Sequence, residues 1–314
     1  MIKYTLRRVL LVIPVMLILS FLVFSMFNFL PSNAAVIAAG EHAIPEVIEY
    51  YRDLMGLNYS FFERYFRWLS NFIFNQHLGY SLMGRFPIFP VVLMALSTSF
   101  RIVFIAMPIS LIIGIPVGIV SAVKQYSFFD RVGMVLTVIM ASMPSFWQAM
   151  LLNLLIIHLV RNGFLSIEIF IGGNNPFFLV LSAVILGLSF TAIIARMTRS
   201  SILEEIYQDY IRTPRAFGQT ERVVILKHAL KNALIPIITT MGLNFGLLLV
   251  GSIYFEIVFR LNGTGLLLLS AIRSRDYPIL MGIIMMYGLI FSILNLIIDL
   301  LYAYIDPRIR TQYK

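Results

Sequence analysis

Six long apolar runs constrain this chain more than any other feature of its sequence. A helix rises 1.5 Å per residue, so about 20 consecutive apolar residues are needed to cross the hydrocarbon of a bilayer. With 60% of its 314 residues hydrophobic and 12% charged, the chain carries more apolar surface than a soluble domain can bury. We therefore predict an all-α integral membrane protein with six transmembrane helices, at residues 9–30, 97–123, 132–160, 177–196, 233–257 and 279–303.

Prolines occur inside several of these runs. Pro144 lies in the middle of the third run, and Pro14 and Pro108 lie in the first two. Bilayer helices accept proline when their neighbours satisfy the freed backbone groups. We interpret these prolines as kinks in continuous spans.

The distribution of Lys and Arg predicts the orientation of the spans. With the N-terminus in the cytoplasm, the cytoplasmic flanks hold 15 of the 24 Lys and Arg residues. Of the nine on the other side, four lie in one long loop, which the positive-inside rule discounts. Both termini are therefore predicted to be cytoplasmic.

The long external segment, residues 31–90, carries helical periodicity of its own. Apolar residues from Ile44 to Met55 recur at helical spacing and predict a short amphipathic helix. Ser60 and Glu63 then form a possible capping box ahead of a second helix rich in aromatic and basic residues. That helix would lie on the membrane surface or roof the helix bundle, and we favour the roof.

A basic segment, Arg212 to Pro236, separates the fourth and fifth runs. A charged segment of this length is costly in lipid, so we expect it to lie in water, and its positive charge places it in the cytoplasm. It is the one place where a soluble partner could bind the membrane part.

Several kinds of chemistry lack their residues in this chain. It has no GxxxxGK[ST] motif, no cysteine, and four histidines without ligand spacing, so we expect no P-loop, metal or other cofactor. The acids within the spans, Asp299 and Glu256, provide neither a catalytic dyad nor a proton relay. The charge is also too scattered for nucleic-acid binding. We expect no enzymatic activity, while an autonomous carrier and a membrane hydrolase remain as weaker alternatives.

Several segments stand in a recognisable order along the chain: LGYSLMGRFP (78–87), GIPVGIVSAVKQYSFFDR (114–131), SMPSFW (142–147), ARMTRSSILE (195–204), SRDYP (274–278) and NLIIDLLYAYIDPRIR (295–310). In their order and spacing these segments resemble one family, the membrane permeases of ATP-binding-cassette importers in the dipeptide, oligopeptide and nickel branch. The chain is most similar to the first of the two permease subunits.

The resemblance implies a single transmembrane permease domain over 1–314, with an external helical loop at 31–90, core transporter helices at 97–303 and a cytoplasmic ATPase-docking loop at 197–232. It implies a bacterial or archaeal cytoplasmic membrane, a second homologous permease, two ATPase subunits that bind ATP and Mg, and an external solute-binding protein. In the docking loop a short coupling helix, capped at Gly218, would enter a groove of the ATPase. The docking residues would be Arg212, Thr213, Pro214, Arg215, Ala216, Phe217, Gly218, Glu221 and Arg222.

This chain also departs from the family pattern. Relatives read RTARAKG where Pro214 and Phe217 stand here, so we expect the helix either to begin later, with Pro214 in its first turn, or to pack more tightly. For the translocation path we expect Ser142, Pro144, Ser145, Asn153, Met241 and Asn244. The expected cargo is a dipeptide or oligopeptide; a nickel complex, glutathione or an oligosaccharide are the alternatives within the family.

Overall fold

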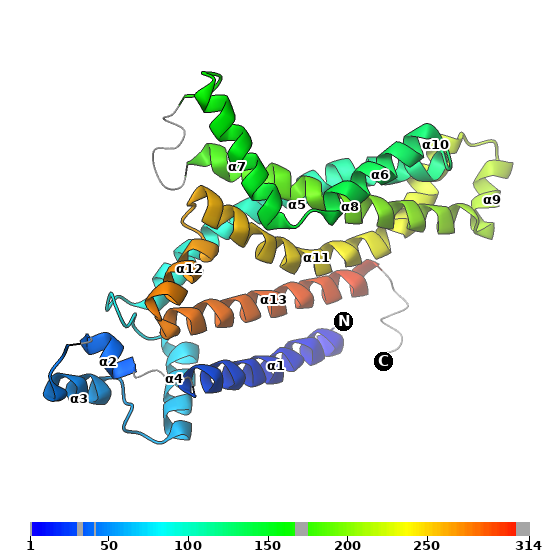
Figure 1. Cartoon of the computed structure of the whole chain (residues 1–314). Helices are drawn as coiled ribbons and strands as arrows, with labels where there is room; N and C mark the ends of the chain where they lie inside the picture. The colour runs from blue at the N-terminus through cyan, green and yellow to red at the C-terminus, as the bar shows by residue number, and fades with distance from the viewer. Residues whose placement is uncertain (1, 30–33, 41, 167–174, 306–314) are drawn as a thin grey trace. The chain divides into compact units, whose positions relative to one another are not determined.

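The computed structural model describes residues 2–29, 34–40, 42–166 and 175–305, and these are almost entirely helical (Figure 1). One antiparallel bridge, Tyr80 to Pro87, is the sole β pairing among them. The helices are α1 (Ile2–Asn28), α2 (Ala34–Ala39), α3 (Pro45–Leu54), α4 (Phe61–Asn75), α5 (Ile88–Val123), α6 (Phe128–Ser142), α7 (Ser145–Arg161), α8 (Pro176–Ile206), α9 (Asp209–Ala216), α10 (Glu221–Val223), a π-helix η2 (Val224–Ala229), α11 (Leu230–Phe259), α12 (Thr264–Ser274) and α13 (Tyr277–Ile305).

Five helical segments are long and apolar enough to cross a membrane. They lie at Thr5–Asn28, Ile88–Val123, Pro176–Ile206, Glu221–Phe259 and Tyr277–Leu300, and they match five of the six predicted runs. The prediction of an all-α membrane protein is therefore confirmed. Asp306 to Arg310, at the end of the last family segment, lies outside the described residues.

The third predicted span, residues 132–160, is not one continuous helix. It divides into α6 and α7, which are bent by 96° at the break. Pro144 explains the break: its ring disfavours helical geometry in the residue before it, and Met143 is extended, with φ −83° and ψ 121°. The bend at Pro144 is therefore sharper than the kink that we expected for most of these prolines.

The break between α6 and α7 is stabilised by side chains. The Gln148 amide nitrogen donates to the carbonyls of Met140, at 3.2 Å, and Met143, at 2.8 Å, both at the end of α6. Its side-chain oxygen accepts the Ser189 hydroxyl of α8. These contacts satisfy polar groups that the interrupted helix leaves without partners.

The described helices fall into two compact units. Unit 1 comprises residues 1–97 and 263–296, and unit 2 comprises residues 98–262 and 297–314. The boundaries that the family resemblance implies remain predictions.

In unit 1, α1 packs closely against α13, and α4 packs on both. A Cβ on Gly288 of α13 would lie 2.1 Å from a Leu19 methyl, so a larger residue there would require the Leu19 side chain to move. The shared core of these three helices contains Val23, Phe24, Tyr65 and Met281.

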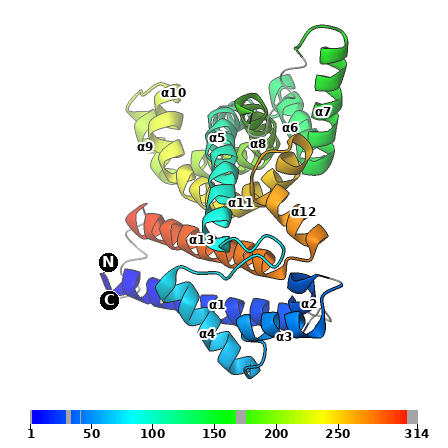
Figure 2. The same cartoon turned by 90° about the vertical axis from the view of Figure 1, so that its left-hand side faces the viewer.

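In unit 2, α8 lies between α5, α6 and α11 in two views of the molecule (Figures 1 and 2). Gly114 and Gly118 lie one helical turn apart on α5 and face α8. A Cβ on Gly118 would lie 2.5 Å from the Thr198 Cβ and 2.6 Å from the Ala195 carbonyl oxygen. This small-xxx-small contact is how membrane helices approach without a hydrophobic driving force.

Candidate functional site

The helix α9 lies in the basic segment and ends in a well-formed cap. Gly218 has φ +72°, a left-handed conformation that glycine adopts without steric cost. Its N–H donates to the Arg215 carbonyl at 3.0 Å, and the Gln219 N–H donates to the Pro214 carbonyl at 3.1 Å. These two bonds form a Schellman motif, so the predicted helix end at Gly218 is confirmed.

The start of α9 differs from our expectation. The helix begins at Asp209, ahead of Arg212, and Pro214 occupies its last turn instead of its first. Pro214 has no N–H to donate to the Tyr210 carbonyl, so α9 lacks one hydrogen bond here, although the fixed φ of proline is a helical one. Its ring is buried, so Pro214 helps to seat the helix.

One side chain anchors α9 to the rest of unit 2. Ile211 is fully buried in a cluster that we call the α9 seat. The seat joins α9 to α5, α8, η2 and α11 through Ala122, Ile202, Ile211, Val224, Ala229 and Ala233, with Ile119, Leu203, Ile206 and Leu230 packed against them. Sequence reasoning missed Ile211, although its i, i+3 spacing with Pro214 marks a common face.

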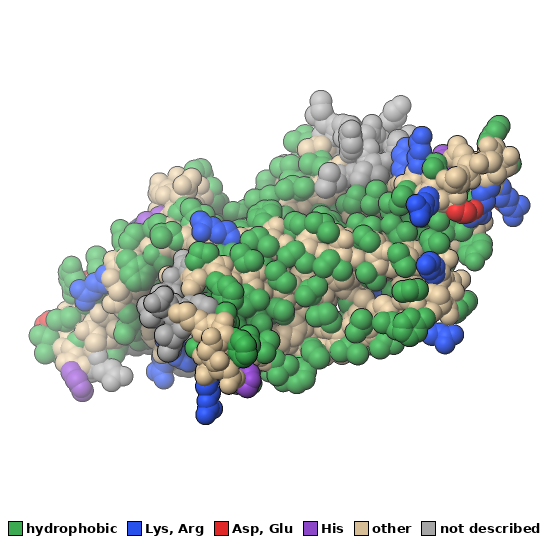
Figure 3. Space-filling model, turned by 90° about the horizontal axis from the view of Figure 1, so that it is seen from above, with side chains coloured by type: hydrophobic (Ala, Val, Ile, Leu, Met, Phe, Trp, Pro, Cys, Tyr) green, Lys and Arg blue, Asp and Glu red, His purple; other side chains and the backbone are tan. Residues whose placement is uncertain are grey.

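The opposite side of α9 and the turn after it are exposed. Phe217 is 82% exposed, and the Arg212 side chain is 80% exposed, 3.5 Å from Asp209. Arg215 forms a forked pair with Glu221, at 2.8 and 3.3 Å. Figure 3 shows Lys and Arg side chains gathered at the end of the viewed face that carries α9. An exposed aromatic ring among fixed cations is suited to bind a protein partner.

Tyr210 ties the first turn of α9 to the end of α8. Its hydroxyl donates to the Glu205 carboxylate. Partial burial, together with this hydrogen bond, raises the pKa of Tyr210 to about 12. The phenol therefore stays neutral and remains a donor.

The chain enters the fifth span through a π-helix next to α9. The π-helix η2 continues directly into α11, and its Val224 and Ala229 belong to the α9 seat. The His228 Nε2 and Gln219 side-chain oxygen lie 2.8 Å apart, which joins η2 to the turn after α9. π-helical turns are frequent at functional sites.

A buried ion pair that we did not predict joins α6 to α8. Arg199 donates to both oxygens of Asp130, at 2.9 and 3.0 Å, and the Asp130 side chain is only 5% exposed. The Tyr126 N–H donates to the same carboxylate at 2.9 Å. The pair fixes the start of α6 against α8, the helix that leads to α9.

Two family models together match residues 1–311. The one described as binding-protein-dependent transport system inner membrane component matches residues 114–311, and the one described as its N-terminal counterpart matches residues 1–113. The chain belongs to this family. It is therefore the permease subunit of an ABC importer and a multi-pass protein of the inner membrane.

Named relatives share the full length of this permease. It is 38% identical to the glutathione transport system permease protein GsiC of Pectobacterium atrosepticum, over 99% of each chain. It is 37% identical to the dipeptide transport system permease protein DppB of Alkalihalophilus pseudofirmus, over 99% of this chain and 100% of that one. A structure of the MetNI methionine ABC transporter in inward-facing conformations matches with a TM-score of 0.54, over 69% of this permease and 96% of that chain. At 17% identity, that match shows the fold alone.

The residues predicted for the translocation path lie around the break between α6 and α7 and on α11. Ser142 is exposed and bonds the Val138 carbonyl of its own helix at 2.8 Å, and Pro144 is exposed at the start of α7. Ser145 faces α11, where its hydroxyl lies 3.6 Å from a Cβ built on Gly251.

The other three predicted path residues are less exposed. Asn153 on α7 is half-buried, as is Met241 on α11. Asn244 is 8% exposed and donates to the Thr240 carbonyl at 2.6 Å, so its amide is held against its own helix. The assignment of all six residues to a path stays a prediction.

Proposed function

We propose that this permease imports short peptides, with ATP hydrolysed by two partner ATPase subunits and the cargo delivered by an external solute-binding protein. The named relatives support this substrate class, because a dipeptide and glutathione are both short peptides with a free amine and carboxylates. A second, homologous permease completes the path. Both termini and α9 lie in the cytoplasm, in keeping with the distribution of Lys and Arg.

The observation that carries the proposal is the seat of α9. A short helix with an exposed aromatic and basic face has its buried face packed on several helices of unit 2 at once. A push on the exposed face therefore reaches α5, α8 and α11 through Ile211. Closure of the ATPase pair would rotate these helices as rigid bodies, so that the cargo path opens to the other side of the membrane.

The proposal that α9 and the turn after it bind an ATPase subunit is tested by the substitution Gly218→Val. A β-branched residue at positive φ is strained by about 1–2 kcal/mol or more, so the cap and the Phe217 position shift. Transport and substrate-stimulated ATPase activity should fall together in proteoliposomes that contain the complete complex, while membrane insertion stays normal. Normal coupling would refute the docking assignment.

Gly163 provides a matched control. It has φ +76° and, like Gly218, nothing within 4 Å of a built Cβ, but it follows α7. Gly163→Val carries the same strain and should leave ATPase coupling close to wild type.

The substrate class needs its own measurement. Proteoliposomes that contain the complex, supplied with its binding protein, should take up a labelled dipeptide or glutathione when ATP is enclosed in the lumen and the ATPase subunits face the lumen. If a nickel complex or an oligosaccharide were taken up and the peptides were not, the peptide assignment would be replaced and the docking assignment would be unaffected.

A further inference from the structure

The helix α4 has two apolar stripes, of which only one is covered. The inner stripe packs on α1: the Phe61 and Tyr65 rings lie 5.5 Å from Phe24, and the Trp68 ring lies 5.6 Å from it. The second, which we call the outer stripe, is spaced i, i+4, i+11 and so lies on one face of the helix. The outer stripe consists of Phe62, Phe66 and Ile73, which are 62%, 62% and 56% exposed.

The contacts of Tyr65 fix the depth at which α4 lies against α1. Between Arg8 and Asn28 the helix α1 offers only about 29 Å of apolar length, so the hydrocarbon must cover nearly all of it. The Tyr65 hydroxyl lies 2.9 Å from the Ser20 hydroxyl and donates to the Leu17 carbonyl at 3.4 Å. Ser20 is eight residues before Asn28, or about 12 Å inside that boundary. The inner stripe of α4 therefore reaches into the hydrocarbon.

The outer stripe is continuous with the exposed surface of this span. Phe29, 76% exposed at the end of α1, stacks on Phe61 at 5.3 Å, and Phe61 contacts Phe62 at 5.4 Å. On α1 itself Leu22 and Met26 are 59% and 54% exposed at the same level. An unbroken apolar surface thus runs from the membrane-spanning helix onto α4.

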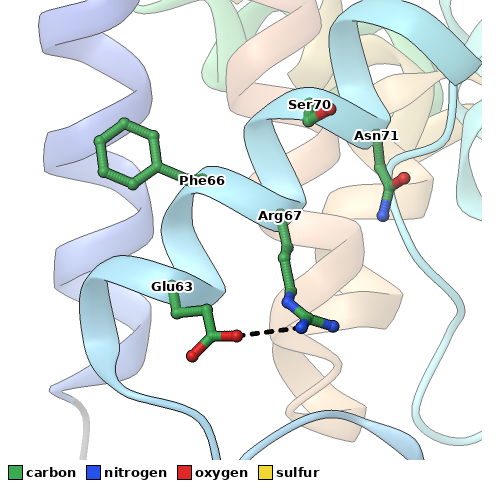
Figure 4. A pocket seen from close by; sticks show the side chains of 5 residues that line it. All are labelled: Glu63, Phe66, Arg67, Ser70 and Asn71. Carbon is green, nitrogen blue, oxygen red and sulfur yellow. Dashed lines mark hydrogen bonds and ion pairs between the residues drawn. The ribbon is translucent and has the colours of Figure 1, made fainter.

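The adjoining side of α4 is polar. A shallow groove there is lined by Glu63, Phe66, Arg67, Ser70 and Asn71, and Figure 4 shows Phe66 on one side of the helix with Glu63 and Arg67 on the other. Arg67 pairs with Glu63 at 2.9 Å. An apolar stripe beside a polar one is the arrangement of helices that lie at the boundary between acyl chains and headgroups.

We infer that α4 is an interfacial membrane helix whose outer stripe binds the acyl chains of the leaflet around the C-terminal half of α1. Its polar side meets the headgroups and water. This replaces the roof that the sequence suggested: α4 covers α1 and α13 with one stripe and lipid with the other. The helix then holds the end of α1 at a fixed depth.

The absence of cysteine from the chain makes a direct test possible. Phe66→Cys and Asn71→Cys place single exposed thiols on the outer stripe and on the polar side of α4. The full-length permease in lipid nanodiscs is labelled with a bimane probe, and quenching by lipids brominated on their acyl chains is measured. Phe62→Cys serves as a second outer-stripe position.

The probes at residues 66 and 62 should be quenched strongly, and the probe at residue 71 weakly. Before labelling, the outer-stripe thiols should react at least about tenfold more slowly than the thiol at residue 71 with a membrane-impermeant reagent, because they are buried in acyl chains. Equal reactivity at all three positions would overturn the inference. So would protection of residue 66 that arises only when the solute-binding protein is added, since its occupant would then be a protein.

Discussion

The two short amphipathic helices α4 and α9 have similar buried faces and opposite exposed ones. Each is held by one central side chain, Tyr65 in α4 and Ile211 in α9, packed among membrane-spanning helices. Beyond that, α4 presents an aromatic stripe next to an apolar span, whereas α9 presents Phe217 between arginines beside a turn rich in polar residues. The buried face decides where a helix sits, and the exposed face decides what it binds.

Loss of the α9 seat should have the largest effect. Ile211→Asp buries an uncompensated charge at a fully covered position and costs at least about 3 kcal/mol locally, so α9 should leave its seat. Transport and ATPase coupling in the complete complex should both be lost. Gln208→Asp adds the same charge at the exposed N-cap of α9 and should be tolerated; equal defects in both variants would contradict the seat.

Loss of the packing between α4 and α1 should have a milder effect and should not impair binding of the ATPase subunits. Phe24→Ala removes a ring that contacts three aromatic side chains of α4. We expect this substitution to destabilise the packing of α4 by only about 2 kcal/mol, because lipid replaces part of the lost contacts. Hydrogen exchange in α4 should accelerate while ATPase assembly stays normal. Phe24→Leu should leave the rate of hydrogen exchange in α4 close to that of the wild type. If Phe24→Ala weakened ATPase binding, the two helices would not act separately.

Two equally exposed rings, Phe74 on α4 and Phe217 at the end of α9, test whether the exposed faces of these helices bind different partners. Phe217 is 82% and Phe74 is 79% exposed, so replacing either with Ala should change the stability of the fold by less than about 0.5 kcal/mol. Phe217→Ala should nevertheless weaken binding of the ATPase subunits about tenfold, as truncation of an aromatic anchor does. Phe74→Ala should leave that affinity unchanged. Titration of purified ATPase onto the permease in nanodiscs measures both.

The smallest effect is expected at Tyr210. Because its pKa is raised from 10 to about 12, the folded protein holds the phenolic proton more tightly than the unfolded chain. Its stabilising contribution is thus constant below pH 10 and is lost as the pH rises through about 12. Tyr210→Phe should cost about 1 kcal/mol at most and should remove one late step from the phenolate absorbance titration. An unchanged titration above pH 11 would contradict the raised pKa.

The sequence predicted features that depend on residues close together in the chain. Long apolar runs located the spans, Ser60 was recognised as a helix cap and accepts the Glu63 N–H at 3.4 Å, and Gly218 was recognised as a helix end. Each follows from the composition or spacing of one short segment.

Features that depend on distant residues were missed. The sharp bend at Pro144 is stabilised by Gln148 and by Ser189 of another helix, and the two sides of the break are equally apolar. Asp130 and Arg199 lie in segments that were both noted but never paired, since nothing in a single sequence relates their positions. The start of α9 was missed because the basic segment was taken to begin at Arg212, and Asp209 and Tyr210 precede it.

The bend between α6 and α7 has a consequence for biosynthesis. At about 1.5 Å per residue neither helix alone reaches across the hydrocarbon, so a crossing by residues 128–161 needs both helices together. The Ser189 hydroxyl that accompanies the bend is synthesised later. The contact between Gln148 and Ser189 therefore forms only after α8 has been made, and a ribosome-bound chain that stops before α8 should hold the bend less rigidly than the finished protein does.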